Sequence, residues 1–450
     1  MRIPAIRITR LVTAVTAAAL IAPGLARADN PLFTARGVGA RALALGNSFT
    51  ALANDYTAVY WNPAGIAFTP IREVRIGLEA MRSQAETEFG TTTSDASSQR
   101  LLITHAGLLR SIPTSQGGFA FAVGFCSPYR LDNVFRYQGW DTYTGAGREG
   151  YYTIGTDAQG QPIRDVIESG QQVYFAEADA RGHGSLSLIN LAVGWQIAPS
   201  LGLGVTLSPI LGREYVSYVF ETYKQENGST YLFQDHIEEI RRRYRGVDAR
   251  MGLLYAPSGI VRAGIRLVAP QYIRMYQAYT FREQYYGTLY EELDDEATIT
   301  TSVSGAAGVA IELPFMTVST ESDFRSPFPD ARRNAPQAYW RVGLSGGVEA
   351  PIPQTPLVVR AGYAWHEPDF VPYQIEWDNA LEESNVTVDY TSDVHQVTGG
   401  VGAVLQNYLS LQASYAYSFW GSSAGSPDWR NAIDERHALH RMLVSFSFRY

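Results

Sequence analysis

The sequence is short of cysteine, of charge and of long apolar runs. Cys126 is the single cysteine of 450 residues, so no intramolecular disulfide can staple the fold. Charged residues make up 18% and the formal net charge is −8, which argues against nucleic acid as a partner because a phosphate-binding surface needs a net basic face. Past residue 28, no stretch approaches the roughly 18 apolar residues of a membrane helix.

The first 28 residues are typical of an export signal. Arginines precede an apolar core from Leu11 to Leu25, and Ala26-Arg27-Ala28 supplies the small-x-small pattern of a cleavage site. A membrane anchor is the alternative, but the stretch is short and is broken by Pro23-Gly24. We therefore predict a signal peptide over residues 1–28 and a mature chain that begins at Asp29.

Aromatic residues and glycine are abundant instead, and apolar side chains alternate with polar ones. The 28 Tyr, 19 Phe and 41 Gly suit strands that are apolar on one side only. The last ten residues show the two faces: Met442, Val444, Phe446, Phe448 and Tyr450 on one, and Arg441, Ser445, Ser447 and Arg449 on the other. Only Leu443 breaks the rule. Because an unpaired arginine in a dry core is costly, one face must meet lipid and the other water.

Fourteen segments carry this alternation with varying clarity. They are Arg72–Met81, Leu101–Leu109, Gly117–Phe125, Ser185–Ile197, Leu201–Phe220, Tyr244–Tyr255, Ile260–Tyr276, Thr300–Leu313, Phe315–Phe324, Trp340–Ala350, Leu357–Trp365, His395–Leu405, Leu409–Phe419 and Arg441–Tyr450. Strands in lipid must close into a ring without edges, and bacterial barrels have an even strand number. We predict an all-β fold, a closed antiparallel transmembrane β-barrel of about 14 strands over residues 71–450, in the outer membrane of a Gram-negative bacterium.

The links between these segments alternate in length, as expected for tight periplasmic turns and long outer loops. The short links are Ile112–Gln116, Ala198–Ser200, Pro257–Ser258, Pro314, Pro351–Thr355 and Gln406–Asn407. The long links are Ser83–Ser98, Ser127–Gly184, Glu221–Arg243, Thr280–Ala297, Arg325–Gln337, His366–Val394 and Gly421–His437. A soluble sandwich has no reason to sort its loops in this way.

Residues 29–70 do not alternate, and we predict that they form an N-terminal plug, or hatch, with short helices inside the barrel. Arg41–Ala53 has the spacing of a small amphipathic helix that presents Leu45, Phe49 and Leu52 on one apolar face. In Tyr60–Gly65, Asn62 before Pro63 favours a fixed turn.

Three runs in this region resemble the start of the FadL family of outer-membrane long-chain fatty acid transporters and of its PorV-like relatives. They are Gly39–Gly46, Phe49–Asp55 and Ala58–Gly65, with weaker similarity at Arg341–Leu344, Arg360–Tyr363 and Ala413–Tyr417. The resemblance implies a fourteen-stranded barrel whose hatch contains Asn62, Pro63 and Ala64. It also implies lateral exit of hydrophobic substrates at a kinked strand.

Carriage of a fatty acid requires an apolar slot and a cation for the carboxylate head. Five arginines have the parity of the lumen and are candidate head-group contacts: Arg262, Arg266, Arg341, Arg360 and Arg441. The alternative is that they pair with lumenal carboxylates and fill the pore, as charged residues in most barrels do.

Other clusters of charged residues are explained by ordinary structural roles. The acidic run Glu291–Glu296 lacks the ordered spacing of a calcium site and is expected in a solvated outer loop. Arg241–Arg245 opens a predicted strand at the outer rim, where it would pair with lipopolysaccharide phosphates or serve rim solubility. Seven histidines occur without a motif that joins any of them to a serine, so we predict no enzymatic activity, no catalytic residue, no metal site and no cofactor.

The leading hypothesis is an outer-membrane protein that passes hydrophobic compounds, such as long-chain fatty acids, through a hatch-gated barrel. One alternative is a PorV-like accessory barrel that binds a secretion-system protein, and another is a plain diffusion porin. Expected partners are hydrophobic small molecules, outer-membrane lipid and lipopolysaccharide, and the barrel-assembly machinery. The shared N-terminal motif does not separate the transporter from the accessory barrel.

Overall fold

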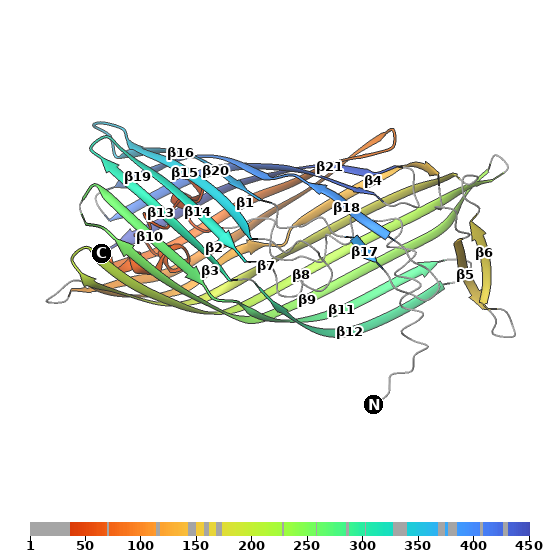
Figure 1. Cartoon of the computed structure of the whole chain (residues 1–450), viewed down its shortest axis with the longest axis horizontal. Coiled ribbons are helices and arrows are strands. Elements are labelled where there is room, and N and C mark those ends of the chain that lie inside the picture. Colours follow the sequence, from red (N-terminus) through yellow and green to blue (C-terminus); the bar gives the residue numbers. More distant parts are fainter. Residues whose placement is uncertain are drawn as a thin grey trace, which may run out of the picture.

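Figure 1 shows the computed structural model of the chain, which forms one long barrel. The structure describes residues 37–69, 72–113, 118–142, 150–156, 162–167, 173–226, 229–257, 259–284, 288–301, 303–326, 340–367, 374–376, 385–405, 408–425 and 431–450. The predicted signal peptide and the first residues after it lie outside these ranges.

Antiparallel strands pair in sequence order around the barrel. The strands are β1 (Arg72–Phe89), β2 (Thr92–Pro113), β3 (Gly118–Arg130), β4 (Asn133–Thr142), β5 (Gly150–Thr156), β6 (Pro162–Ile167), β7 (Val173–Ala198), β8 (Leu201–Glu226), β9 (Ser229–Tyr255), β10 (Val261–Val268), β11 (Tyr272–Gln284), β12 (Thr288–Thr300), β13 (Ser304–Leu313), β14 (Met316–Arg325), β15 (Arg341–Pro351), β16 (Leu357–His366), β17 (Gln374–Glu376), β18 (Asn385–Thr391), β19 (Val394–Leu405), β20 (Leu409–Gly425) and β21 (Ile433–Arg449). Pairing of β1 with β21, from Glu73 opposite Arg449 to Phe89 opposite Ile433, closes the ring.

The ring has fourteen positions, which confirms the predicted strand number. Three positions are each built from two consecutive strands: β3 with β4, β10 with β11, and β12 with β13. The hairpin β5–β6 forms a separate sheet, and β17 and β18 extend from the link between β16 and β19. Among the described residues, no helix has the length and apolar character to cross a membrane.

The wall is apolar outside and polar inside. On β1, Val74, Ile76 and Leu78 are exposed while Glu73, Arg75 and Glu79 are buried. The same alternation recurs around the ring, as the sequence predicts. A soluble protein buries its apolar side chains, so this inverted arrangement is suited to lipid outside and to a protein-filled or wet interior. The protein is therefore a multi-pass outer-membrane β-barrel.

The two ends of the barrel differ, but less sharply than the sequence indicated. At the end that holds the C-terminus (Figure 1), tight links join Ala198 to Leu201 and Leu313 to Met316, which marks this end as periplasmic. At the other end, most of the residues predicted as long loops continue the strands, so that only two residues separate β1 from β2.

The outer loop predictions for Ser83–Ser98, Glu221–Arg243 and much of Thr280–Ala297 are therefore wrong. Glu291–Glu296 belongs to β12, and Arg241–Arg245 lies in the middle of β9 instead of opening it. The physical reason is that both faces of a hairpin above the bilayer are wet. The apolar signal ends there, whereas backbone pairing continues.

Residues 37–69, here called the inner segment, lie inside the ring. They contain two short helices and one 3-10 helix: α3 (Ala40–Ala44), α4 (Ala58–Trp61) and η1 (Pro63–Phe68). The predicted helix over Arg41–Ala53 is wrong beyond Leu45, because Gly46 and Asn47 both adopt positive φ values of 64° and 67°. This left-handed pair turns the chain and ends α3 after one turn.

Candidate functional site

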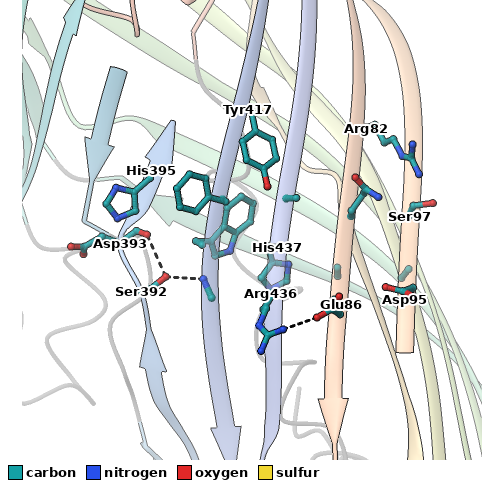
Figure 2. Close-up of a pocket in the computed structure, with 17 residues that line it drawn as sticks. Arg82, Glu86, Asp95, Ser97, Ser392, Asp393, His395, Tyr417, Arg436 and His437 are labelled. Carbon is teal, nitrogen blue, oxygen red and sulfur yellow. Dashed lines mark hydrogen bonds and ion pairs between the residues drawn. The ribbon is translucent and has the colours of Figure 1, made fainter. Parts of the chain in front are cut away.

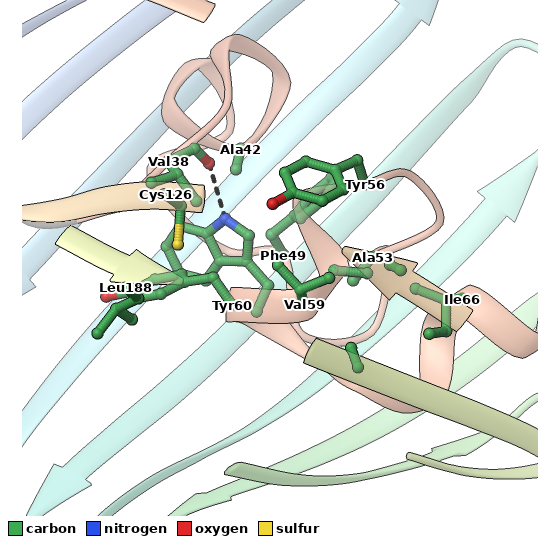
Figure 3. Packing of buried hydrophobic residues seen from close by; sticks show 14 of the residues in the cluster. Val38, Ala42, Phe49, Ala53, Tyr56, Val59, Tyr60, Ile66, Cys126 and Leu188 are labelled. Atoms are coloured by element: carbon green, nitrogen blue, oxygen red, sulfur yellow. Dashed lines mark hydrogen bonds between the residues drawn. The ribbon is translucent and has the colours of Figure 1, made fainter. Parts of the chain in front are cut away.

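The inner segment is seated on glycines of the barrel wall. Figure 3 shows the apolar cluster at its centre, which includes Phe49, Val59, Tyr60 and Ile66. Within it, Trp61 Nε1 donates to Val38 O at 2.8 Å. Leu45, Phe49 and Leu52, the predicted apolar face, are all at most 2% exposed. They reach the cluster through successive turns and not from one helix.

Nine wall glycines, on nine different strands of the ring, face this segment so closely that a Cβ would lie within 3 Å of it. They are Gly107, Gly124, Gly194, Gly204, Gly252, Gly264, Gly347, Gly362 and Gly400. A Cβ at Gly308, on a tenth strand, would lie 3.5 Å from the Ala51 nitrogen. At Gly264 the nearest atom is Thr50 O at 2.5 Å, and at Gly400 it is the Ala44 Cβ at 2.7 Å. The backbone or side chains of the segment thus lie directly against the wall backbone around the ring.

Glu321 of β14 anchors the first turn after α3. Its carboxylate accepts hydrogen bonds from the Phe49 nitrogen at 2.9 Å, the Thr50 nitrogen at 2.7 Å and the Thr50 hydroxyl at 2.9 Å. Arg266 Nη2 lies 3.8 Å from the same carboxylate. A buried carboxylate with three donors and a nearby cation holds this turn to the wall.

Arg41 lies within α3 and anchors that helix to the wall. It makes a bidentate pair with Glu349 of β15, with N to O distances of 2.8 and 3.0 Å, and donates to Asn54 Oδ1 at 2.7 Å. Arg360 of β16 pairs with the same carboxylate at 2.5 Å. Glu349 therefore joins one wall arginine and one inner-segment arginine.

Asp55 and Tyr56 fix the segment to β1. The Asp55 carboxylate lies 3.1 Å from Arg75 and accepts bonds from the Thr57 nitrogen and hydroxyl at 2.8 and 2.5 Å. Burial alone would raise the pKa of Asp55, but Arg75 and the Thr57 bonds outweigh it and hold that pKa below its ordinary value. The Tyr56 nitrogen donates to Glu73 at 2.8 Å.

The Asn62-Pro63-Ala64 motif lies against β8 and β9. Asn62 Nδ2 donates to Thr50 O at 2.8 Å and to Leu253 O at 3.1 Å, and its Oδ1 accepts from the Ala64 nitrogen at 3.1 Å. The last bond caps η1, and Pro63 occupies the first helical position, where its missing N–H is no loss. The motif thus ties three stretches of chain together.

The five predicted head-group arginines all point inward. Four of them lie beside carboxylates: Arg262 by Glu312 at 2.7 Å, Arg266 by Glu321, Arg360 by Glu349, and Arg441 by Glu79. Arg266 also stacks over Trp61 at 5.4 Å. Arg341 is 7% exposed and faces inward on β15. Contact with a ligand head stays a prediction for all five.

Sequence reasoning missed the partners that hold these arginines. Glu79, Glu321 and Glu349 each occupy a lumen-facing position in the alternation of a predicted strand. That position was the signal from which their pairing with lumenal arginines could have been predicted. Glu79 is fully buried between Arg130 Nη2 at 2.7 Å and Arg441. The three side chains, from β1, β3 and β21, form a buried ion-pair cluster that we call the charged layer.

A second apolar cluster lies toward the outer end of the barrel, on β1, β4, β7, β8 and β21. It comprises Phe89, Phe135, Tyr137, Ala176, Ala178, Ala180, Tyr218, Phe220 and Ile433. Each of these residues is at most 9% exposed. Tyr137 packs against Phe89 and Phe135 with ring centroids 5.1 and 5.3 Å apart. The mouth is therefore aromatic, whereas the layer below it is charged.

The wall is interrupted beside that charged layer. β2 pairs with β3 from Pro113 to His105, where His105 lies opposite Cys126, and no ladder joins the described residues of β2 beyond His105 to β3 or β4. β4 pairs with β7 instead. We use the name seam for Thr92–Thr104, the part of β2 that has no ladder to β3 or β4.

Side chains replace backbone pairing at the seam. Arg100 Nη1 donates to Asp132 Oδ1 at 2.7 Å and to Gly184 O at 2.8 Å. Leu101 beside it is 76% exposed, more than any other large hydrophobic side chain in the described part of the chain. Tyr56 of the inner segment reaches the last paired residues, where its hydroxyl donates to Phe125 O at 3.3 Å.

A recess of about 800 Å³ lies near the outer ends of β1, β20 and β21 (Figure 2). Arg82, Gln84 and Glu86 line it, and they alternate with the buried lumenal residues of β1. The recess therefore opens largely on the outer surface of the wall. Arg436 in its rim pairs with Glu86 at 2.9 Å and with Glu88 at 3.1 Å.

The described residues contain no group of three or more His, Cys, Asp or Glu side chains arranged to hold a metal ion. Cys126 is buried and lies near Asn190.

No protein-family model matches the sequence. No curated protein matches it either. Solved structures do match the fold. A FadL homologue of Pseudomonas aeruginosa superposes with a TM-score of 0.62 at 11% identity, and the match covers 92% of this chain and 99% of that one.

Two further structures agree with this likeness. The toluene transporter TodX of Pseudomonas putida matches with a TM-score of 0.58 and 13% identity over 92% of this chain and 99% of that one. The monoaromatic hydrocarbon channel CymD matches with a TM-score of 0.53 and 13% identity over 93% and 99%. The chain therefore has the fold of the FadL homologues, as its N-terminal motifs predict.

Proposed function

We propose that the protein passes hydrophobic small molecules from the cell exterior into the outer membrane or across it. The observation that carries this proposal is that the inner segment, which lies inside the ring, is next to the seam, where the wall is interrupted. The inner segment touches wall strands around the ring. Beside it, the ladder between β2 and β3 ends at His105 and Cys126. An unpaired strand edge is a liability that a closed barrel otherwise removes, so its presence requires a reason.

The route begins at the mouth cluster and ends at the seam. Phe135, Tyr137 and Phe220 offer an apolar entry site, and the charged layer of Glu79, Arg130 and Arg441 below it disfavours passage of an apolar molecule straight down. Leu101 lies twelve residues from the periplasmic end of β2, which is roughly 40 Å along the strand and about 30 Å in height. The seam thus opens near the outer edge of an apolar band about 25 Å tall.

The substrate class that fits best is neutral and apolar. Four of the five predicted head-group arginines already lie within 4 Å of a carboxylate, so a fatty acid would have to compete with an ion pair for each of them. The toluene and monoaromatic hydrocarbon channels that share the fold support the same class. Long-chain fatty acids remain the second candidate.

The inner segment acts as a hatch in this proposal, and Asn62 is its test. Asn62→Ala removes three hydrogen bonds, worth about 2–4 kcal/mol together, and leaves the wall untouched. We expect the barrel to assemble and the uptake of labelled toluene by whole cells to rise several-fold, because the displaced state of the segment becomes more populated. Pro63→Ala should act in the same direction with a smaller effect.

Asn431→Ala is the matched control, because Asn431 also donates side-chain bonds, to Asp141 Oδ1 at 3.0 Å and to Trp140 O at 3.5 Å, but does so at the outer end of the barrel. Wild-type uptake in both motif variants would count against a working hatch. Parallel uptake of labelled oleate separates the two substrate classes. Co-purification of the protein with a large secretion complex, without any uptake, would instead favour the accessory role.

A further inference from the structure

Four arginines meet on the outer face of the wall, away from the lumen. They lie on three adjacent strands: Arg213 on β8, Arg243 and Arg245 on β9, and Arg274 on β11. Arg243 is directly opposite Arg213, and Arg245 is directly opposite Arg274. All four are exposed, and directly opposite residues have Cβ atoms about 5 Å apart. We call this set the arginine patch.

No carboxylate of the described residues forms an ion pair with any of the four. The nearest outward-facing acids are Glu239, which pairs with Arg241 at 3.4 Å, and Glu296, which lies opposite Tyr276. Like charges directly opposite each other on a sheet destabilise it. Two such pairs side by side concentrate positive charge on this part of the wall.

The patch lies at the upper edge of the apolar band. Below it on the same three strands, Leu211, Val247 and Tyr272 are 50%, 53% and 65% exposed. Arg245 is ten residues from Tyr255 at the periplasmic end of β9, which corresponds to about 33 Å along the strand and about 25 Å in height. That height matches the thickness of the apolar band, so the guanidinium groups lie at the level of outer-leaflet headgroups.

Arginine elsewhere on the outer face is balanced within the chain. Arg436 pairs with Glu86 on the neighbouring strand (Figure 2) and also with Glu88. Arg181 pairs with Asp179 at 2.9 Å. The arginine patch differs because tyrosines and apolar side chains surround it and no carboxylate of the described residues forms an ion pair with it.

We propose that the arginine patch binds the phosphate groups on the headgroup of an outer-leaflet glycolipid. Guanidinium groups bind phosphate oxygens bidentately, and the apolar side chains just below them lie where the acyl chains of the same lipid run. Tyr272 and Tyr276 flank the patch at the level that aromatic residues favour. This site is independent of transport, since it faces away from the lumen.

The test measures lipid binding by the purified full-length protein in detergent, by native mass spectrometry. The probes are lipopolysaccharide and the same lipid after enzymatic removal of its phosphates. We expect wild-type protein to retain the phosphorylated lipid preferentially. The double variant Arg243→Gln with Arg274→Gln removes one member of each opposed pair, and each lost charge-assisted bond weakens binding about tenfold.

Arg436→Gln is the matched control and should bind as wild type. Heat-modifiable migration on a gel checks that each variant has folded. Equal retention of both lipids, or unchanged binding in the folded double variant, would overturn the proposal. Displacement of the lipid by millimolar inorganic phosphate alone would also overturn it, because the patch would then be a free-anion site. Weaker wild-type binding at high salt, with little salt dependence left in the double variant, would support it.

Discussion

The wall surface that holds the inner segment, here called the seat, is closely packed, whereas the seam next to it lacks backbone pairing. At the seat, wall glycines bring the segment against the wall backbone, and Glu321, Glu349 and Asn62 join the segment to strands on different sides of the ring. At the seam, a ladder is missing over Thr92–Thr104, and Arg100 bridges the interval with two bonds.

The difference shows where the molecule is able to move. Displacing the segment requires breaking many bonds that are buried from water, each worth about 1 kcal/mol or more. Opening the seam further requires the loss of one half-exposed arginine clasp. Tyr56 touches both regions, since its nitrogen is held by Glu73 and its hydroxyl reaches Phe125 beside the seam. We therefore expect motion of the segment to be transmitted to the seam through Tyr56.

The largest expected effect is at the seat. Glu321→Ala removes the acceptor of three hydrogen bonds and leaves Arg266 without its carboxylate, a loss of about 3–5 kcal/mol. Hydrogen exchange of residues 47–53 should accelerate strongly while the strands stay protected. The control is Glu435→Ala, which removes a buried carboxylate near the outer end of β21. Unchanged exchange at residues 47–53 would show that Glu321 is not an anchor.

A smaller effect is expected at the seam. Arg100→Ala removes the clasp to Asp132 and Gly184, at a cost of about 1 kcal/mol for a partly exposed pair. Exchange of the β2 amides between Thr92 and Thr104 should become faster, and uptake of labelled toluene should rise. Arg110→Ala is the control, because Arg110 lies where β2 is paired on both sides. If both variants behave alike, the seam has no special role.

The smallest effect is the pH dependence of the seat. The pKa of Asp55 is lower in the folded protein than its ordinary value of 3.8. The Asp55 anchor therefore contributes its full stability above about pH 4 and loses it as the pH falls through the lowered pKa. Proteolysis of the inner segment by an acid-active protease should increase only below that pH. In Asp55→Asn this pH dependence should vanish, and its persistence would assign the acid sensitivity to other carboxylates.

Several features of the fold could be predicted from particular residues. The alternation over Met442–Tyr450 gave the lipid face and the lumenal face, and both are as predicted. Leu443, the exception, packs with Ala40, Leu43 and Ala416 under the inner segment. An apolar residue on the lumenal face thus marked a contact with the inner segment and not a flaw in the pattern.

Other features could not be predicted from local patterns. Helical spacing over Arg41–Ala53 gave a false helix, because contact with the wall fixes the turn at Gly46 and Asn47. The break between Val268 and Tyr272 was predicted as continuous strand, although Pro270 lacks the N–H that a ladder needs. The seam could not be read from β2 itself, because its polar residues from Thr92 to Arg100 look like any strand end above the bilayer.

The sequence by itself determined which side chains face lipid and which face inward, because period-two geometry is a property of each strand alone. It also determined the number of strands, because every crossing of the band needs its own apolar face. Only the tertiary structure decided which lumenal charges pair, where the wall is left unpaired and that four arginines on three strands share one patch. Those facts depend on register between strands far apart in the chain, and a register is a relation between two segments that neither segment encodes alone.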